Sequence, residues 1–188
     1  LQKELYMQML SNMKETDENL PFRRDDYFYY TRTVKGQSYA IHCRKKATSK
    51  SQSVLDAVDL VDEVILDENE VASGHDYCVV DECEPSPSHA TLAYSLDITG
   101  YETYEIRVKN LTSGEQIDSI SDTSGSVEWG TDDSTFFYLK MDAEHRPYQL
   151  WMHSVGMDVS TDLLLLQEDD GKLWMGAGKT NSNDFLVV

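Results

Sequence analysis

The sequence is poor in cysteine, in basic side chains and in long apolar runs, and each shortage excludes a class of protein. Three cysteines in 188 residues argue against a disulfide scaffold and fit a reducing compartment. No apolar run approaches the ~20 residues that span a bilayer. Sixteen Lys and Arg against 34 Asp and Glu give a formal net charge of −18. Such a chain repels nucleic acid and anionic membranes and attracts cationic ligands, so we expect neither nucleic acid nor a membrane as partner.

Two short motifs suggest a cofactor or a metal, and both fail on spacing. Gly178-Lys179-Thr180 ends like a phosphate-binding loop, but the position five residues before Gly178 is not glycine. A turn composition then follows at 181–184, where a phosphate site needs a helix. His75, Cys78 and Cys83 lack the paired spacing of a zinc site. The sequence therefore predicts no cofactor and no metal, and we interpret the cysteines as ordinary thiols.

The acidic residues cluster in one stretch of the sequence. Seven acids without an intervening Lys or Arg stand there: Asp56, Asp59, Asp62, Glu63, Asp67, Glu68 and Glu70. In the absence of a located site, the simplest interpretation is a solvated acidic surface.

A repeated pattern of aromatic and aliphatic residues runs along the chain. Three segments, 28–43, 92–108 and 136–152, carry a triplet that ends in Tyr: Tyr30, Tyr94 and Tyr138. Nine or ten residues later comes a second Tyr: Tyr39, Tyr104 and Tyr148. Two positions beyond it stands an aliphatic residue that we treat as equivalent in the three segments: Ile41, Ile106 and Leu150. Period-two alternation predicts strands, and the polar loops between them predict one hairpin in each segment.

The spacing of these hairpins predicts an all-β fold built from repeats. The interval from Tyr94 to Tyr138 is 44 residues, and from Phe136 to Phe185 it is 49. Four short strands in ~40 to ~50 residues are typical of propeller blades. Fourth strands are expected near 116–117 and at 163–166, and 178–180 is expected to end an inner strand of the next blade. A strand end at 64–66 and a short helical turn at 69–72 are also expected.

The N-terminal segment reads as a helix over residues 1–13. Leu1, Leu5, Met9 and Met13 form one stripe at i, i+4 spacing. We expect this stripe to dock on a neighbouring core, because two lysines are too few to anchor a helix on an anionic membrane.

Several stretches resemble the trypsin-like, oligopeptidase B branch of the prolyl oligopeptidase family of serine peptidases. They are LQKELYMQML, YYTRTVKGQSYAIHCRKK, EVASGHDY, LAYSLDITGYETYEIRVKNL, TSGSVEW and RPYQLWMH. The resemblance implies a cytoplasmic enzyme with a seven-bladed propeller and an α/β-hydrolase domain that carries a Ser-Asp-His triad. It also implies cleavage of short peptides after Arg or Lys.

The resemblance assigns this chain to the non-catalytic part of such an enzyme. No G-x-S-x-G nucleophile motif is present, and His75, His89, His145 and His153 make no triad without a nucleophile. We therefore expect no catalytic residue in the chain. Residues 1–25 would be a helical extension that packs on the hydrolase domain, and 26–188 the first propeller blades, incomplete at the C-terminus. The expected partner is the remainder of the polypeptide.

Two residues are predicted to contact the hydrolase domain. Glu102 lies in the loop of the second hairpin and Arg146 in the matching loop of the third. Loops at equivalent places in a radial repeat emerge on one face, where charged residues can meet another domain. A propeller without enzymatic activity that binds other proteins stays open as an alternative, since a fold does not set a function.

Overall fold

The computed structural model describes residues 1–57 and 60–188 as two compact units, residues 1–73 and 74–188. We call them the first and the second unit. The predicted boundary between a 1–25 extension and a 26–188 propeller part lies inside the first unit and stays a prediction. No helix in the described ranges has the length and hydrophobicity that a bilayer crossing requires.

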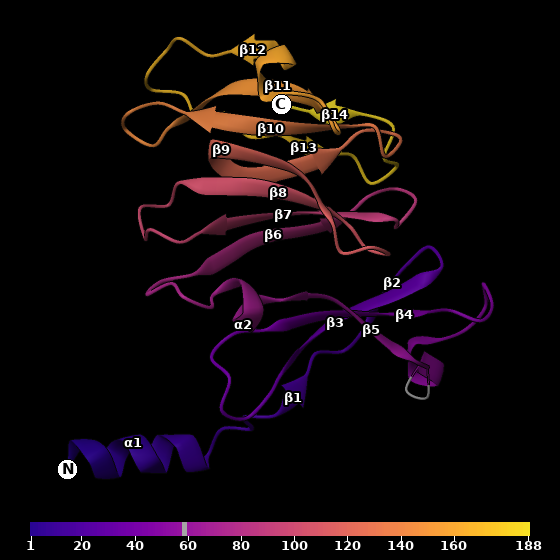
Figure 1. Cartoon of the computed structure of the whole chain (residues 1–188), viewed down its shortest axis with the longest axis vertical. Coiled ribbons are helices and arrows are strands. Elements are labelled where there is room, and N and C mark those ends of the chain that lie inside the picture. The colour runs from indigo at the N-terminus through magenta and orange to yellow at the C-terminus, as the bar shows by residue number, and fades with distance from the viewer. Residues whose placement is uncertain (58–59) are drawn as a thin grey trace. The chain divides into compact units, whose positions relative to one another are not determined.

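The first unit contains the N-terminal helix and an antiparallel sheet (Figure 1). Its sheet runs in the order β1-β3-β4-β5, and β2 pairs with β3. The elements are α1 (Gln2–Ser11), β1 (Asp17–Glu18), β2 (Phe22–Arg24), β3 (Tyr27–Thr33), β4 (Ile41–Lys46), η1 (Val54–Ala57), β5 (Asp62–Asp67) and α2 (Glu68–Val71). The predicted first hairpin is confirmed as β3 and β4, and the strand and helical turn expected at 64–72 are β5 and α2.

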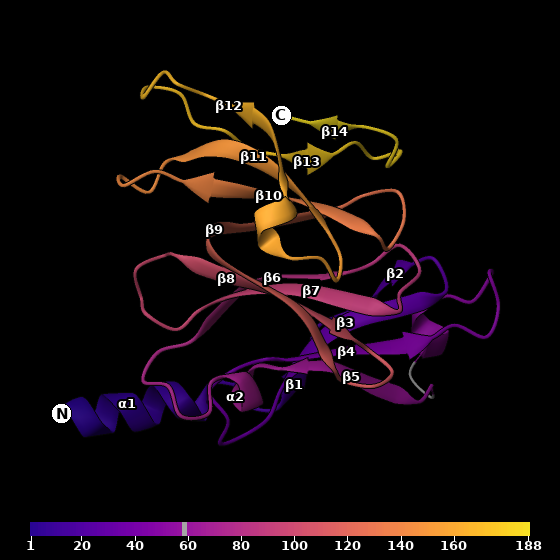
Figure 2. The same cartoon turned by 45° about the horizontal axis from the view of Figure 1, so that its top comes forward.

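The second unit is a run of antiparallel strands in the order β12-β11-β10-β9-β8-β7-β6, followed by the small pair β13 and β14. Figures 1 and 2 both show β6 to β12 side by side. The strands are β6 (Val79–Pro85), β7 (Thr91–Asp97), β8 (Tyr104–Asn110), β9 (Gln116–Trp129), β10 (Thr135–Met141), β11 (Pro147–Ser154), β12 (Leu163–Gln167), β13 (Gly178–Lys179) and β14 (Leu186–Val187). A short helix, η2 (Val159–Thr161), precedes β12.

Strand β9 serves two successive repeats. Its residues 116–123 pair with β8, and its residues 123–129 pair with β10. Thr123 is opposite both Tyr104 and Lys140, so the strand changes direction there. Gly125 permits this bend, because its φ is 92° and a Cβ at this position would lie 3.0 Å from neighbouring atoms, which leaves no room for a side chain. The predicted fourth strands, at 116–117 and 163–166, are confirmed.

The core of the second unit lies between these two repeats. Ile106, Val108 and Ile120 come from the first repeat, and Trp129, Phe136 and Tyr138 from the second. The Trp129 and Phe136 rings meet edge to face at 5.7 Å, a favourable geometry for aromatic pairs. The Trp129 indole donates to the carbonyl of Glu84, which joins β9 to β6. The turn after β13 matches the turn after Trp129, as predicted, because β13 pairs with β14 as the end of β9 pairs with β10.

One predicted equivalence within the repeats is wrong. Ile41 lies opposite Arg32, two residues after Tyr30, and packs with Tyr30 and Cys43. Ile106 lies opposite Ser95, one residue after Tyr94. Leu150 likewise lies opposite Leu139, one residue after Tyr138. Strand side chains alternate, so the one-residue difference puts Ile41 on the opposite face from its supposed counterparts. The nine-residue Tyr spacing of the first segment, against ten in the others, is the cause.

Candidate functional site

The loops of the second and third hairpins form the first candidate site. Loop 98–103 joins β7 to β8, and loop 142–146 joins β10 to β11. Tyr104 follows one loop and Lys140 precedes the other, and both pair with Thr123. The two loops therefore emerge at the same end of the second unit, as Figure 1 shows.

Glu102 is held at the tip of its loop by a buried carboxylate. Asp97 is 1% exposed and accepts hydrogen bonds from the backbone N–H groups of Thr99, Gly100 and Glu102 at 2.7, 3.0 and 2.9 Å. Burial alone would raise the pKa of Asp97, but these bonds and the Thr99 hydroxyl outweigh it and lower the pKa. Glu102 has a φ of 57° and an exposed side chain. The loop thus presents its acid in a fixed backbone conformation.

Arg146 occupies a different environment from Glu102. It is 8% exposed, and its Nε donates to Asp142 Oδ2 at 2.8 Å. Its Nη1 donates to the carbonyls of Leu173 and Asp170 at 2.8 and 3.1 Å. The guanidinium therefore ties its own loop to the segment that follows β12. Sequence reasoning missed this role, because the carbonyl partners lie 24 and 27 residues away.

A second candidate site is a group of carboxylates on two strands. Asp81, Glu82 and Glu84 lie on β6, and Glu128 lies on β9. Burial first, then the neighbouring charges of Glu84, Asp81 and Glu128, raise the pKa of Glu82 to about 7. A cation arriving here would relieve this repulsion. Sequence reasoning missed this group too, because its signal, the short D-E-C-E run of β6, is less conspicuous than the longer run at 56–70.

That longer acidic run is partly paired with bases in the first unit. Asp62 lies 3.3 Å from Lys45 Nζ and 3.2 Å from Arg32 Nη1. Glu63 accepts a two-pronged bond from Arg44, with both contacts at 2.7 Å. Asp59 lies outside the described residues. Asp67 caps α2 by accepting from Asn69 N, and Asp56 and Glu70 are exposed. The run thus combines cross-strand pairs on β5 with solvent-exposed acids.

His153 has the partners of a catalytic histidine but not the access. Its Nδ1 is 2.7 Å from Asp162 Oδ1, and its Nε2 is 3.6 Å from Asp118 Oδ1. The Tyr138 hydroxyl donates to Asp162 at 2.8 Å. The His153 side chain is fully buried, so no substrate reaches it, and it joins β9, β11 and the η2 segment instead.

The three cysteines are free thiols. Cys43 and Cys78 are buried, and Cys83 is half-buried. Within residues 1–57 and 60–188, no three His, Cys, Asp or Glu side chains are arranged to hold a metal ion.

Comparison with known proteins identifies the family. The prolyl oligopeptidase N-terminal β-propeller domain matches residues 1–188. The chain belongs to this family. Its sheets are therefore those of the family's propeller domain, which confirms the resemblance drawn from the sequence.

Curated relatives and solved structures agree with this assignment. Protease 2 of Moraxella lacunata is 32% identical over 99% of this chain and 27% of its own length. Dipeptidyl aminopeptidase BI of Pseudoxanthomonas mexicana is 32% identical over 100% of this chain and 27% of its own.

Oligopeptidase B from Leishmania major superposes on the propeller with a TM-score of 0.89 and 33% identity, over 98% of this chain and 25% of its own. Oligopeptidase B from Trypanosoma brucei with covalently bound antipain superposes with a TM-score of 0.86 and 36% identity, over 98% of this chain and 25% of its own. The chain spans about a quarter of the length of the proteins that it matches.

Proposed function

We propose that this chain is the non-catalytic N-terminal and propeller part of a serine endopeptidase similar to oligopeptidase B. The likeness to two oligopeptidase B structures over 98% of the chain carries the proposal. The chain spans only a quarter of their length, which supports its assignment to one part of such an enzyme. The propeller, seven-bladed in the whole protein, would restrict access to an active site supplied by the remainder of the polypeptide. The enzyme would be cytoplasmic and cleave short peptides after Arg or Lys.

The acidic residues of the second unit support a preference for basic peptides. Asp81, Glu82, Glu84 and Glu128 concentrate negative charge on β6 and β9. A group of like charges around a half-buried carboxylate attracts cationic side chains over distances of about a Debye length. Arg- or Lys-containing peptides would therefore be enriched near these strands before they reach the active site.

Residues 1–25 would pack on the hydrolase domain through α1. None of residues 2–11, all of which are described, is buried. Leu1, Leu5, Met9 and Met13 are 89, 50, 67 and 65% exposed, although Met13 lies beyond the helix end at Ser11. An exposed apolar stripe of this kind fits a docking surface for another domain.

Glu102 would pair with the hydrolase domain when the enzyme closes. Arg146 would hold its own loop, 142–146, toward the same interface. The fixed backbone of loop 98–103 and the exposed Glu102 side chain support this assignment. A contact that forms only in the closed state shifts the balance between open and closed forms. We expect Glu102→Gln in the intact enzyme to lower kcat/KM on Arg-peptides several-fold, with little change in Tm.

The control is Glu115→Gln, which removes an exposed charge from the turn between β8 and β9, away from loop 98–103. It is expected to leave kcat/KM unchanged. An unchanged kcat/KM in Glu102→Gln, or a loss matched by unfolding, would remove Glu102 from the mechanism.

A substrate panel on the intact polypeptide tests the proposed activity. The panel contains internally quenched peptides with a single Arg, Lys or Leu, and products are identified by mass spectrometry. Cleavage after Arg and Lys supports the proposal, and cleavage after Leu alone contradicts it. An intact polypeptide that cleaves nothing and resists labelling by a serine-directed inhibitor would favour the non-enzymatic propeller.

A dipeptidyl aminopeptidase is the second candidate function. Dipeptidyl aminopeptidase BI is as similar to this chain as Protease 2, at 32% identity. The same panel separates the two, because a dipeptidyl aminopeptidase releases N-terminal dipeptides and is blocked when the N-terminus is acetylated.

A further inference from the structure

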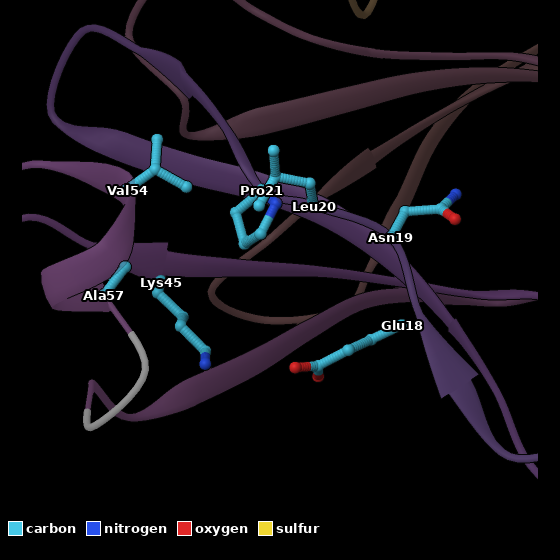
Figure 3. Close-up of a pocket in the computed structure, with 7 residues that line it drawn as sticks. All are labelled: Glu18, Asn19, Leu20, Pro21, Lys45, Val54 and Ala57. Atoms are coloured by element: carbon cyan, nitrogen blue, oxygen red, sulfur yellow. The ribbon is translucent and has the colours of Figure 1, made fainter.

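The first unit contains a pocket of about 300 Å³ (Figure 3). The chain reaches it from three places: the β1–β2 segment, strand β4 and the short helix η1. Its lining residues are Glu18, Asn19, Leu20, Pro21, Lys45, Val54 and Ala57. A volume of this size holds a small molecule rather than a folded partner.

One side of the pocket is apolar. Leu20 is 78% exposed, whereas Ala57 is buried. Pro21 and Val54, both half-buried, complete this wall. An aliphatic group in the pocket would cover the exposed Leu20 side chain, and the removal of that surface from water favours binding.

The other side of the pocket presents two opposite charges. Figure 3 shows the Glu18 carboxylate and the Lys45 ammonium directed toward one another, while Asn19 points away. The Asn19 amide is engaged with Thr31 Oγ1 at 2.7 Å. The Lys45 side chain is 8% exposed, and Asp62 Oδ1 lies 3.3 Å from its Nζ. The same Nζ lies 5.2 Å from the centroid of the Tyr30 ring. An ammonium has three donors, and a ligand carboxylate would join these contacts.

We propose that this pocket binds a zwitterionic aliphatic amino acid or dipeptide. The ligand carboxylate would meet Lys45, its ammonium would meet Glu18, and its side chain would lie on Leu20, Pro21 and Val54. A purely anionic ligand would face the Glu18 carboxylate, and a basic side chain would lie against the apolar wall. The zwitterion satisfies both charges at once, and charge-assisted hydrogen bonds are the stronger class. The proposal does not depend on peptidase activity.

Calorimetric titration of the intact polypeptide with leucine tests the ligand class. N-acetylleucine lacks the ammonium and leucinamide lacks the carboxylate, so we expect each to bind at least about tenfold more weakly than leucine, the effect of losing one charged hydrogen bond. Arginine is expected to bind more weakly than leucine. Absence of leucine binding, or equal binding of leucine and N-acetylleucine, would overturn the proposal.

Two variants locate the site. Glu18→Gln is expected to weaken leucine binding roughly tenfold, whereas Asp17→Asn, the adjacent acid of β1 that binds Lys14, should leave it unchanged. Lys45→Met should abolish binding, with Tm measured alongside because Lys45 is buried. Equal binding by Glu18→Gln and the unaltered protein contradicts the proposal even if Lys45→Met fails to fold. Because no hydrolysis is measured, failure here is distinct from failure of the proposed peptidase function.

Discussion

The two units carry very different charge on the same kind of antiparallel sheet. The first unit, residues 1–73, has ten Lys and Arg and thirteen Asp and Glu, a formal net charge of −3. The second unit, residues 74–188, has six basic and twenty-one acidic residues, a net charge of −15. Most of the acidity of the chain therefore belongs to the second unit.

The first unit neutralises its strand carboxylates with basic side chains directly across the sheet. Arg44 is opposite Glu63, and Lys45 is opposite Asp62, on β4 and β5. The Arg44–Glu63 pair has both contacts at 2.7 Å, and the Arg44 guanidinium also lies 4.5 Å from the centroid of the Tyr27 ring. Such cross-strand pairs stabilise the sheet and cancel charge at the same time.

The second unit binds many of its carboxylates with uncharged donors. Asp97 accepts three backbone N–H groups, and Asp118 accepts from the backbone N–H of Gly156 at 2.9 Å. Asp158 accepts from Ser160 N at the start of η2. These bonds fix loops and turns but leave the negative charge in place. The comparison shows that the same fold uses carboxylates to pair strands through ion pairs in one unit, and to fix loops while keeping their negative charge in the other.

The largest expected effect separates these two uses of a carboxylate. Asp97→Asn removes the charge and keeps one carbonyl oxygen for Thr99 and Gly100, but it turns an amide NH2 toward the N–H of Glu102 on a 1% exposed side chain, so we expect a loss of about 3 kcal/mol in the free energy of unfolding. Glu63→Gln keeps one acceptor for Arg44 on a 44% exposed side chain, so about 1 kcal/mol is expected. Denaturant unfolding at low and high salt measures both. A Glu63→Gln loss as large as that of Asp97→Asn would erase the distinction.

A smaller effect is expected where β9 changes direction between repeats. Gly125 and Gly114 both have positive φ, 92° and 74°, but only at Gly125 would an added Cβ lie 3.0 Å from neighbouring atoms. Gly114→Ala should cost about 1 kcal/mol from backbone strain, and Gly125→Ala about 2 kcal/mol because Tyr104 and Asp81 must also move. Thermal unfolding of both variants measures the difference, and equal losses would mean that crowding does not fix the bend.

The smallest stability effect is expected from Glu82 and depends on pH. The pKa of Glu82 is raised from 4.5 to about 7, so the folded protein keeps this proton while the unfolded chain has lost it. Glu82 therefore makes stability fall as pH rises from about 4.5 to about 7. Glu82→Gln should remove that slope and gain about 1 kcal/mol above pH 7, after allowance for solvent screening of a half-exposed group. If the stability of Glu82→Gln fell with pH as steeply as that of the unaltered protein, the assignment would be contradicted.

The repeat architecture could be predicted from the sequence because the Tyr spacing and period-two alternation are local signals. They located all three hairpins and the turn at 178–180. The face on which Ile41 lies could not be predicted so simply, since one residue fewer between Tyr30 and Tyr39 reverses it.

The candidate sites were harder to predict because they depend on tertiary neighbours. Glu102 was proposed from its loop position alone and stays a prediction; its loop conformation comes from Asp97, five residues earlier. Arg146 was placed in the correct loop, but its carbonyl partners beyond β12 have no sequence signature. Glu82 acquires its raised pKa only where β6 and Glu128 of β9 come close.

Labelling with a serine-directed inhibitor tests the central claim most directly. The intact polypeptide and the isolated 188-residue chain are each incubated with an Arg-ester substrate and a fluorophosphonate probe, and the labelled peptide is identified by mass spectrometry. The account predicts turnover and labelling only in the intact polypeptide, with the adduct outside residues 1–188. Inhibitor-sensitive turnover by the isolated chain, or an adduct on any serine within residues 1–188, would contradict it.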